Sequence, residues 1–301
     1  MTHSDISPTP LRVAVTGGTS GLGRALVAAF VERGDRVAFV ARDRARVHRV
    51  AAELEGSHGI VGDVARKDDA HAIALQIGGA LGGLDVLIHN ASSLGPVPLA
   101  LLADTDCEDV ESALATNVLG PFRLTKALLG LLAASAREAR GDGTRTVVVN
   151  VTSDAAVTPY AGWGAYGASK AALAHMSRIW HEELAPHRVA VIAVDPGDMD
   201  TPLHAAALPD ADPATLKRPR DAAREIVALI DRERAGAAAA SDPSSAFVSL
   251  NGPSTLVASA RSKSSHSVSA SSASGTGPRS DALLTSTSSP PSAPAICMAI
   301  G

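Results

Sequence analysis

The sequence lacks several features that define whole classes of protein. Only two cysteines, Cys107 and Cys297, occur in 301 residues and they form no CxxC pair, which fits a reducing compartment better than a disulfide framework. Basic residues are not in excess either, since 27 Lys and Arg stand against 31 Asp and Glu for a net charge of −4. Binding to a phosphate backbone needs a positive surface, so we expect no binding to nucleic acid. From the few cysteines we expect a cytoplasmic protein.

Long apolar runs are scarce as well. The most apolar patch, residues 127–136, has charged neighbours and is far shorter than the ~20 residues that cross a bilayer. Residues 1–10 carry neither a positive segment nor an apolar core, so we expect a short flexible lead and not a secretory signal. No membrane partner is predicted.

The histidines do not form a metal-binding pattern. His175, His181 and His187 lie six residues apart, and no HExxH motif is present. We therefore expect ordinary helix or loop histidines and no metal site.

The chain is rich in apolar residues, at 46%, which is enough for a sizeable core. Short β-branched runs alternate with longer Ala- and Leu-rich stretches, an order typical of a parallel sheet covered by helices on both faces. This predicts one doubly wound, Rossmann-like α/β domain of three layers, α/β/α, over residues 11–252. The expected strands are 11–16, 36–41, 59–62, 84–90, 145–152 and 188–195, and the expected helices lie near 21–33, 43–55, 66–81, 106–136, 162–184 and 221–234.

The C-terminal stretch departs from this alternation. Residues 241–301 include 19 Ser and six Pro but only five charged residues, a composition that cannot bury enough apolar surface to fold. We expect residues 253–301 to be a disordered Ser-rich tail. The island "SAFVSLNG" at 245–252 could add a last strand to the sheet or remain outside it.

A glycine-rich turn follows the first expected strand. In "VAVTGGTSGLGRAL" at 13–26, Gly17, Gly21 and Gly23 fall between an apolar strand and a helix start. Glycine permits a tight turn, and the absent Cβ lets a pyrophosphate approach the N–H groups of a helix N-terminus. This predicts a dinucleotide cradle, with a plain Gly-rich turn as the alternative.

The end of the second expected strand bears on the choice of dinucleotide. An acidic residue there would accept from a free ribose 2′-OH, whereas an Arg would neutralise a 2′-phosphate. Arg42 comes first and Asp43 follows, which favours NADP over NAD. A solvated surface Arg–Asp pair is the alternative.

Three further features carry chemistry only in combination. Tyr166 and Lys170 share one helical face at i and i+4, although alone they could be a surface pair. Ser153 follows the fifth expected strand, where it could bind a ligand or cap a helix. Asn117 interrupts an apolar helix, where an amide is mildly unfavourable and needs a reason.

Together these motifs resemble the short-chain dehydrogenase/reductase family, in its compact single-domain branch, over about residues 11–235. The motifs occur in the order of that family. They are "TGGTSGLG" at 16–23, "GDV" at 62–64, "HNAS" at 89–92, Asn117 in "ATNVLGPF", Ser153 in "VNVTS", "YGASK" at 166–170 and "DPGDMDT" at 195–201.

The resemblance implies a role for each motif residue. Tyr166 would exchange a proton with the substrate oxygen, Lys170 would hold the nicotinamide ribose and lower the tyrosine pKa, and Ser153 would orient the substrate. Asn117 would form a kinked turn and hold a water that links Lys170 to solvent, with a buried amide satisfying a nearby loop as the alternative. The implied cofactor contacts are Thr16, Gly17, Gly21, Leu22, Gly23, Arg42, Asp63, Val64, Asn90, Ala91, Tyr166, Lys170, Pro196, Gly197 and Thr201.

Departures from the family pattern lie close to these motifs. His89-Asn90-Ala91-Ser92 replaces the usual Asn-Asn-Ala-Gly, which puts the cofactor packing there in doubt. Asp154 follows Ser153 and would either repel an anionic substrate or cap the next segment. Asp198 and Asp200 add negative charge within "DPGDMDT", the segment that the resemblance places at the carboxamide, so an acidic substrate is disfavoured. Residues 198–220 are expected to form a substrate lid.

These observations predict an NADP-dependent oxidoreductase that transfers a hydride between nicotinamide and a small carbonyl or secondary alcohol substrate. The alternative is a non-catalytic NADP-binding sensor or scaffold, but such a protein would not need Asn117, Ser153, Tyr166 and Lys170 together. The resemblance also implies a homo-oligomer, a dimer or tetramer, assembled through helices 106–136 and 162–184.

Overall fold

The structure is a computed structural model that describes residues 9–139, 144–236 and 247–250. Residues 1–8 of the expected lead over 1–10, and the whole of the expected tail over 253–301, lie outside the described residues.

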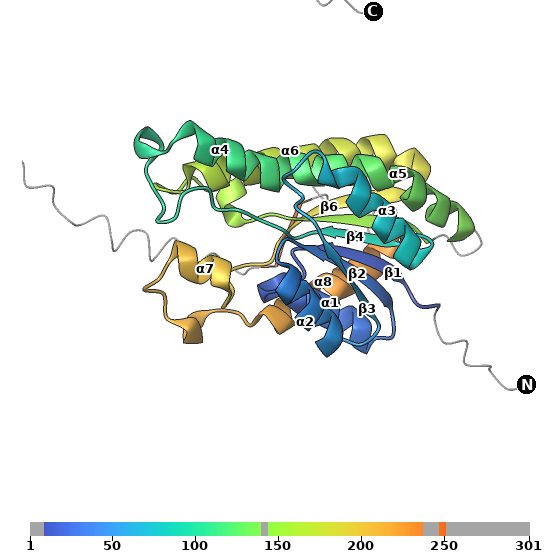
Figure 1. Cartoon of the computed structure of the whole chain (residues 1–301). Coiled ribbons are helices and arrows are strands. Elements are labelled where there is room, and N and C mark those ends of the chain that lie inside the picture. The colour runs from blue at the N-terminus through green and yellow to red at the C-terminus, as the bar shows by residue number, and fades with distance from the viewer. Residues whose placement is uncertain (1–8, 140–143, 237–246, 251–301) are drawn as a thin grey trace, which may run out of the picture.

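A seven-stranded parallel sheet forms the centre of the described part of the chain (Figure 1). Its strand order is β3-β2-β1-β4-β5-β6-β7, so the order reverses between β1 and β4. This confirms the predicted doubly wound sheet, and residues 247–249 form the last strand that the sequence left open. The strands are β1 Arg12–Thr16, β2 Arg36–Ala41, β3 Ser57–Val61, β4 Val86–His89, β5 Thr146–Val151, β6 Val189–Asp195 and β7 Phe247–Ser249.

Helices cover both faces of the sheet, as Figure 1 shows. One face carries α1 (Gly21–Glu32), α2 (Arg44–Glu53) and α8 (Pro219–Arg234), and the other carries α3 (Asp69–Leu81), α5 (Gly120–Glu138) and α6 (Gly164–Leu184).

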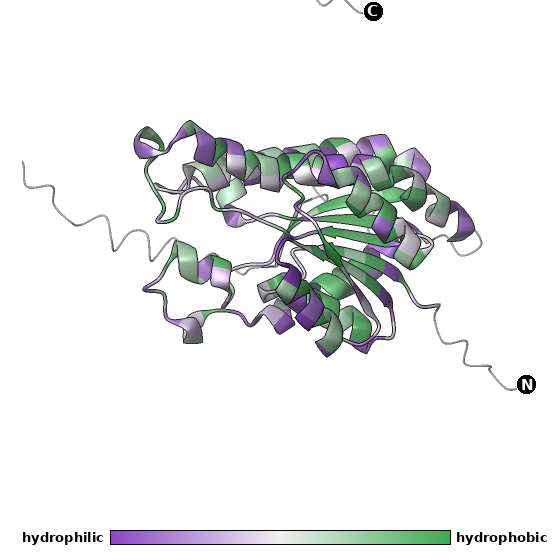
Figure 2. Cartoon of the chain, in the orientation of Figure 1, coloured by the Kyte–Doolittle hydropathy of each residue, from purple (hydrophilic) through white to green (hydrophobic). Residues whose placement is uncertain are grey.

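The buried strands explain both layers of the core. Successive strand residues point to opposite faces, so Val13 and Val15 pack with the cluster beneath α1 and α8, while Ala14 packs with the cluster beneath α3 and α5. The central strands are accordingly apolar along most of their length, whereas the edge strand β3 is more polar (Figure 2).

The single helix expected over 106–136 is wrong in one respect. The structure divides it into α4 (Cys107–Leu114), a π-helical turn at Ala115–Leu119, and α5. Asn117 lies in that turn and is completely buried. Its side-chain amide bonds to groups outside the helix. Single π turns of this kind are frequent at functional sites.

The same helical run also bears on the membrane expectation. By length and composition alone, the helical run Cys107–Glu138 could cross a bilayer. The apolar segment is therefore longer than residues 127–136, the patch on which the expectation from the sequence rested. Its apolar side chains Leu124, Leu128 and Leu132 are buried in the core beneath α3 and α5. A core helix passes the same test, so this run is weak evidence for a membrane span.

The segment expected to be a lid is partly helical. It contains α7 (Pro202–Ala207), which Thr201 caps by accepting from the His204 N–H at 3.2 Å, and a short 3₁₀ turn at Pro213–Thr215. In Figure 1, α7 lies at the end of the sheet where the parallel strands finish.

Candidate active site

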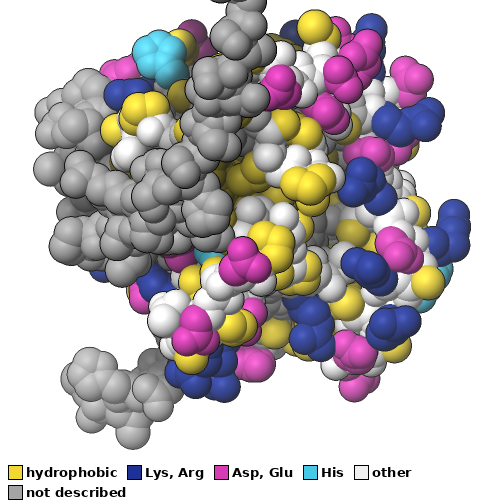
Figure 3. Space-filling view, turned by 90° about the vertical axis from the view of Figure 1, so that its left-hand side faces the viewer, with side chains coloured by type: hydrophobic (Ala, Val, Ile, Leu, Met, Phe, Trp, Pro, Cys, Tyr) yellow, Lys and Arg dark blue, Asp and Glu magenta, His cyan; other side chains and the backbone are white. Residues whose placement is uncertain are grey.

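A cavity of about 570 Å³ opens at the carboxyl ends of the strands, next to the point where the strand order reverses. Open α/β sheets bind their ligands at this place. Figure 3 looks onto this end of the molecule, where the surface is hollowed. All the predicted site residues line the cavity except Thr16, Gly23 and Asn117.

The glycine turn has a backbone that other residues would not tolerate. Gly17 and Gly21 have φ of +71° and +49°, in the left-handed region that favours glycine. A Cβ on Gly23 would overlap the Gly17 carbonyl oxygen and Asn90 Nδ2. Ser20 precedes α1 without a side-chain capping bond, so the first N–H groups of the helix face the cavity. This is a cradle that fits a pyrophosphate.

Thr16 and Asn90 hold this turn in place. Thr16 Oγ1 accepts from the backbone N–H of Asn90 and of Ala91, each at 3.1 Å. Asn90 Nδ2 donates to the carbonyl oxygens of Thr16 and Gly17 at 3.0 and 3.2 Å. Thr16 is buried and therefore shapes the cradle from behind.

The histidine that departs from the family pattern is accommodated in the core. His89 Nε2 lies 2.8 Å from Thr125 Oγ1. Complete burial lowers the His89 pKa to about 3, so the ring is neutral at physiological pH. The departure leaves the contacts of Asn90 intact.

Two arginines flank the cavity at the end of β2. The Arg42 side chain is 78% exposed and lies 4.0 Å from Asp63, whereas Arg46 lies on the first turn of α2. Asp43 accepts from the Arg46 N–H at 3.0 Å and so caps α2. The acidic residue of the Arg–Asp pair is thus used by the helix, while Arg42 stays open to a ligand.

Tyr166 and Lys170 both lie buried on α6 and line the cavity. Lys170 Nζ donates to the Val151 carbonyl at 2.8 Å and lies 5.4 Å from the centre of the Tyr166 ring. Burial lowers the Lys170 pKa to about 7.

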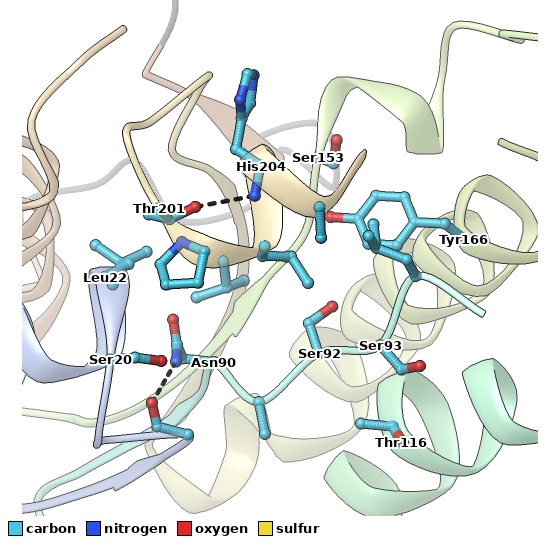
Figure 4. A pocket seen from close by; sticks show the side chains of 18 of the residues that line it. Ser20, Leu22, Asn90, Ser92, Ser93, Thr116, Ser153, Tyr166, Thr201 and His204 are labelled. Carbon is cyan, nitrogen blue, oxygen red and sulfur yellow. Dashed lines mark hydrogen bonds between the residues drawn. The ribbon is translucent and has the colours of Figure 1, made fainter. Parts of the chain in front are cut away.

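The expected lowering of the Tyr166 pKa is wrong in this structure. Burial raises the pKa of Tyr166 above its ordinary value, and the charges of Asp195 and Asp154 raise it further, while hydrogen bonding with Ser153 and Ser92 acts in the opposite direction. Desolvation of the phenolate is the largest effect because the whole side chain is enclosed. Figure 4 shows the Tyr166 hydroxyl directed into the cavity between Ser153 and Ser92.

Asn117 lies behind the cavity wall. Its Oδ1 accepts from the Ser93 N–H at 2.8 Å and from Ser92 Oγ at 3.2 Å, and its Nδ2 donates to the Ser93 carbonyl and to Ser169 Oγ, both at 2.8 Å. These bonds tie the loop after β4 to α6. The kinked turn implied by the family resemblance is present, and the contacts of the amide are those of the alternative in which it satisfies a loop.

Ser153 follows β5 and makes two bonds next to the Tyr166 hydroxyl. Its Oγ accepts from the Ala155 N–H at 3.2 Å, as a cap, and donates to Asp154 Oδ1 at 3.0 Å. Asp154 Oδ2 accepts from the Tyr160 hydroxyl at 2.7 Å. Ser153 is thus the residue that caps the turn after β5. The sequence had left capping open for both Ser153 and Asp154.

Several cavity residues were not predicted as site residues. Asp195 ends β6, and Asp198 and His204 follow it; all three line the cavity. Burial, then the charges of Asp154 and Asp195, raise the Asp198 pKa to about 6. The sequence showed the carboxylates after β5 and β6, but not that they converge on Tyr166, because that depends on the order of the strands.

Known proteins resemble the chain in both sequence and fold. The family model for short chain dehydrogenases matches residues 12–212. The chain is 31% identical over 191 residues to L-fucose dehydrogenase of Mus musculus, covering 64% of this chain and 66% of that protein. It is also 31% identical over 191 residues to serine 3-dehydrogenase of Agrobacterium fabrum, covering 63% and 72%.

A solved structure extends the likeness to the fold. A short chain dehydrogenase from Escherichia coli CFT073, complexed with NADPH, has a TM-score of 0.67 and 28% identity over 74% of this chain and 92% of that chain. The matched family model covers the glycine turn, the Tyr–Lys helix and the segment after β6. The chain belongs to the short-chain dehydrogenase/reductase family, whose members are oxidoreductases of alcohol and carbonyl groups.

Proposed function

We propose that the protein is an NADP-dependent oxidoreductase that interconverts a secondary alcohol and its carbonyl compound. The observation that carries this proposal is the buried Tyr166 hydroxyl, which projects between Ser153 and Ser92 into the cavity that also contains the glycine turn. A proton donor and a dinucleotide cradle in one cavity are what such a reaction needs.

The residues of the cradle fit a nicotinamide dinucleotide. The glycine turn and the α1 N-terminus would hold the pyrophosphate, Asp63 and Val64 would contact the adenine, and Asn90, Ala91, Pro196, Gly197 and Thr201 would line the path to the nicotinamide. When bound, the nicotinamide supplies or accepts the hydride. The NADPH complex of the similar Escherichia coli protein supports this class of cofactor.

Preference for the 2′-phosphate rests on charge. Arg42 presents an exposed guanidinium at the cavity edge, and Arg46 lies four residues later, on the first turn of α2. The Asp43 carboxylate, which would repel a phosphate, caps α2 and forms an ion pair with Arg46 at 3.3 Å, which offsets part of its charge. A guanidinium binds phosphate through charge-assisted bonds.

Tyr166 would exchange the proton. Because burial raises its pKa, the side chain is a neutral phenol at physiological pH and can donate to a carbonyl oxygen as the hydride arrives at carbon. In the opposite direction the phenol must lose its proton first. Lys170, whose pKa burial lowers to about 7, lies 5.4 Å from the centre of the ring, and its protonated form would help that loss.

The charge of the cavity limits the substrate. Asp154, Asp195 and Asp198 line the end that contains Tyr166, so an anionic substrate would be repelled and neutral or cationic polar molecules would be favoured. Two relatives have the names L-fucose dehydrogenase and serine 3-dehydrogenase, which supports a small polar alcohol as the substrate.

The test is a panel of alcohol and ketone pairs with NADP(H) and NAD(H): cyclohexanol with cyclohexanone, 2,3-butanediol with acetoin, and glycerol with dihydroxyacetone, together with L-fucose and L-serine. Turnover that disappears in Tyr166→Phe supports the proposal. Tight NADPH binding without turnover of any compound would instead support the sensor or scaffold.

We also propose that the protein forms a homo-oligomer through α5 and α6. Phe122 on α5 and Trp180 on α6 stack with ring centres 5.5 Å apart. Phe122 is itself exposed, as are its near neighbour in the sequence Leu119 and the neighbour of Trp180, Ile179. An exposed apolar patch of this kind favours contact between subunits. Light scattering of the wild type and of Phe122→Glu would test this, with a smaller species expected for the variant.

A further inference from the structure

The Ser153 hydroxyl has a limited number of hydrogen bonds to offer a substrate. A hydroxyl has one proton to donate and two lone pairs with which to accept. In the structure the proton goes to Asp154 Oδ1 and one lone pair accepts from the Ala155 N–H. The second lone pair lies on the side of the cavity that holds Tyr166, which also hydrogen-bonds with Ser153. It is left for a substrate once the Tyr166 hydroxyl bonds to the substrate oxygen instead.

The Asp154 carboxylate is held in position to accept the hydrogen bond from Ser153. Its other oxygen accepts from the Tyr160 hydroxyl at 2.7 Å. The Tyr160 ring packs edge-on against Trp163, which packs in the same way against Tyr166, with ring centres 6.4 and 5.7 Å apart. The carboxylate is therefore fixed through both oxygens by residues around the cavity.

The competition for the Ser153 proton favours Asp154. A hydrogen bond to a carboxylate is roughly twice as strong as one to a neutral acceptor. A ketone oxygen that enters the cavity would meet the remaining lone pair of Ser153, and two acceptors repel each other. An alcohol can donate its own proton to that lone pair.

We infer that Asp154 is a positioning residue: by holding the Ser153 proton, it makes Ser153 a hydrogen-bond acceptor toward the substrate, so that the site binds the alcohol in preference to the ketone. This inference rests on the proposed function and adds which form of the substrate, the alcohol or the ketone, binds more tightly.

The first test is Asp154→Asn, which keeps the shape of the side chain. The Tyr160 hydroxyl can still donate to the amide oxygen, and the amide nitrogen then donates to Ser153, whose proton becomes free for a ketone. With the pair that turns over fastest in the panel above, the ratio of the KM of the alcohol to the KM of the ketone should rise about tenfold, the effect of about one hydrogen bond. The kcat values should change less than this ratio.

Two further variants separate the hydrogen bond from charge. Asp198→Asn removes a carboxylate from the same cavity, but Asp198 makes no hydrogen bond to Ser153 in the part of the chain that the structure describes. The KM ratio should stay within about twofold there. Tyr160→Phe keeps Asp154 and removes one of its anchors, so the ratio should move in the same direction, by about threefold. An unchanged ratio in Asp154→Asn, or an equal rise in Asp198→Asn, would overturn the inference.

A second readout does not depend on turnover. The sequence contains only two tyrosines, so protein labelled with ¹³C at tyrosine Cζ gives two NMR signals, which Tyr160→Phe assigns. In Asp154→Asn the Tyr160 signal should move because its acceptor changes, and the Tyr166 signal should move through Ser153. An unmoved Tyr166 signal would contradict the positioning role, whatever the activity.

The two proposals fail separately. If both signals move as expected but the wild type turns over no pair, the hydrogen-bond arrangement is supported and the proposed function is overturned. If Asp154→Asn does not fold by circular dichroism, Tyr160→Phe carries the KM comparison and the Tyr166 signal.

Discussion

The cofactor end of the cavity takes its shape from backbone, and the substrate end takes its shape from side chains. At the first, Gly17, Gly21 and Gly23 let the turn pack closely, because an added Cβ would meet Asn90 and Ala91, Thr201, or the Gly17 carbonyl. At the second, Asp154 and Tyr166 come from different elements and meet only because β5 and α6 are neighbours in space.

This difference teaches which properties are local in the sequence. A backbone cradle is encoded in eight consecutive residues and tolerates little change. A side-chain cluster has no local motif, and its polarity can vary while the fold stays the same. Substitutions at the cofactor end should therefore change cofactor affinity and stability, and substitutions at the substrate end should change turnover.

Tyr166→Phe should have the largest effect and separate the two ends most clearly. It removes one oxygen from a buried ring, so turnover should fall about 10³-fold, within the range for loss of a general acid. The affinity for NADPH, measured by fluorescence titration, should change less than about threefold, because the ring of the implied cofactor contact Tyr166 stays in place and the glycine turn is unchanged.

The comparison would break if NADPH affinity fell in parallel with turnover in this variant. That outcome would mean that the phenol helps to hold the cofactor, and that the two ends work as a single unit.

Gly23→Ala should damage the cradle itself. The added Cβ would overlap the Gly17 carbonyl oxygen and Asn90 Nδ2, and such overpacking costs about 1–3 kcal/mol of the free energy of unfolding. NADPH affinity should fall about tenfold or more, since the displaced atoms form the turn.

Gly79→Ala is the matched control for this prediction. Gly79 lies on α3 with nothing within 4 Å of an added Cβ, so this variant should gain about 0.5–1 kcal/mol from the helix propensity of alanine. Urea unfolding of both variants gives the comparison. Equal stability in the two would show that the turn can relax.

Arg42→Ala should weaken NADPH about tenfold and leave NADH almost unchanged. The guanidinium is exposed, so water and salt screen part of its attraction for a 2′-phosphate and the loss stays moderate. Binding titrations with the two dinucleotides measure the difference. Equal losses for both would remove the case for NADP.

The sequence predicted the sheet better than the detail of the helices, for physical reasons. Buried parallel strands are continuous apolar runs, which made the sheet visible, and the short run at 247–249 was ambiguous because it has only three strand residues. A π turn has nearly the same hydrophobic pattern as an α-helix, so the break at Asn117 had no clear apolar signature.

Electrostatics was the property that could not be predicted. The family resemblance implied that Lys170 lowers the pKa of the Tyr166 phenol, but the sequence contains no information about how far the ring is buried. Enclosure of the ring and the approach of Asp195 from β6 raise the pKa instead. Both effects depend on tertiary structure, and the roles of the individual site residues remain predictions.

Asp198→Asn should produce the smallest effect, and one that depends on pH. The Asp198 pKa is raised from 3.8 to about 6, by burial first and then by the charges of Asp154 and Asp195. Between these values the folded protein binds more protons at this site than the unfolded chain does, so the site's contribution to stability is complete below about pH 4 and is lost as pH rises through 6.

Asparagine has no charge to desolvate, so the Tm of Asp198→Asn should exceed that of the wild type at pH 7.5, by on the order of 2 °C. At pH 4, where the wild-type carboxyl is protonated in the fold, the two Tm values should agree. Calorimetry at both pH values measures the difference. A gain of equal size at pH 4 would mean that Asp198 is unfavourable for its packing and not for its charge, and the substrate end would then be less acidic in effect than its composition indicates.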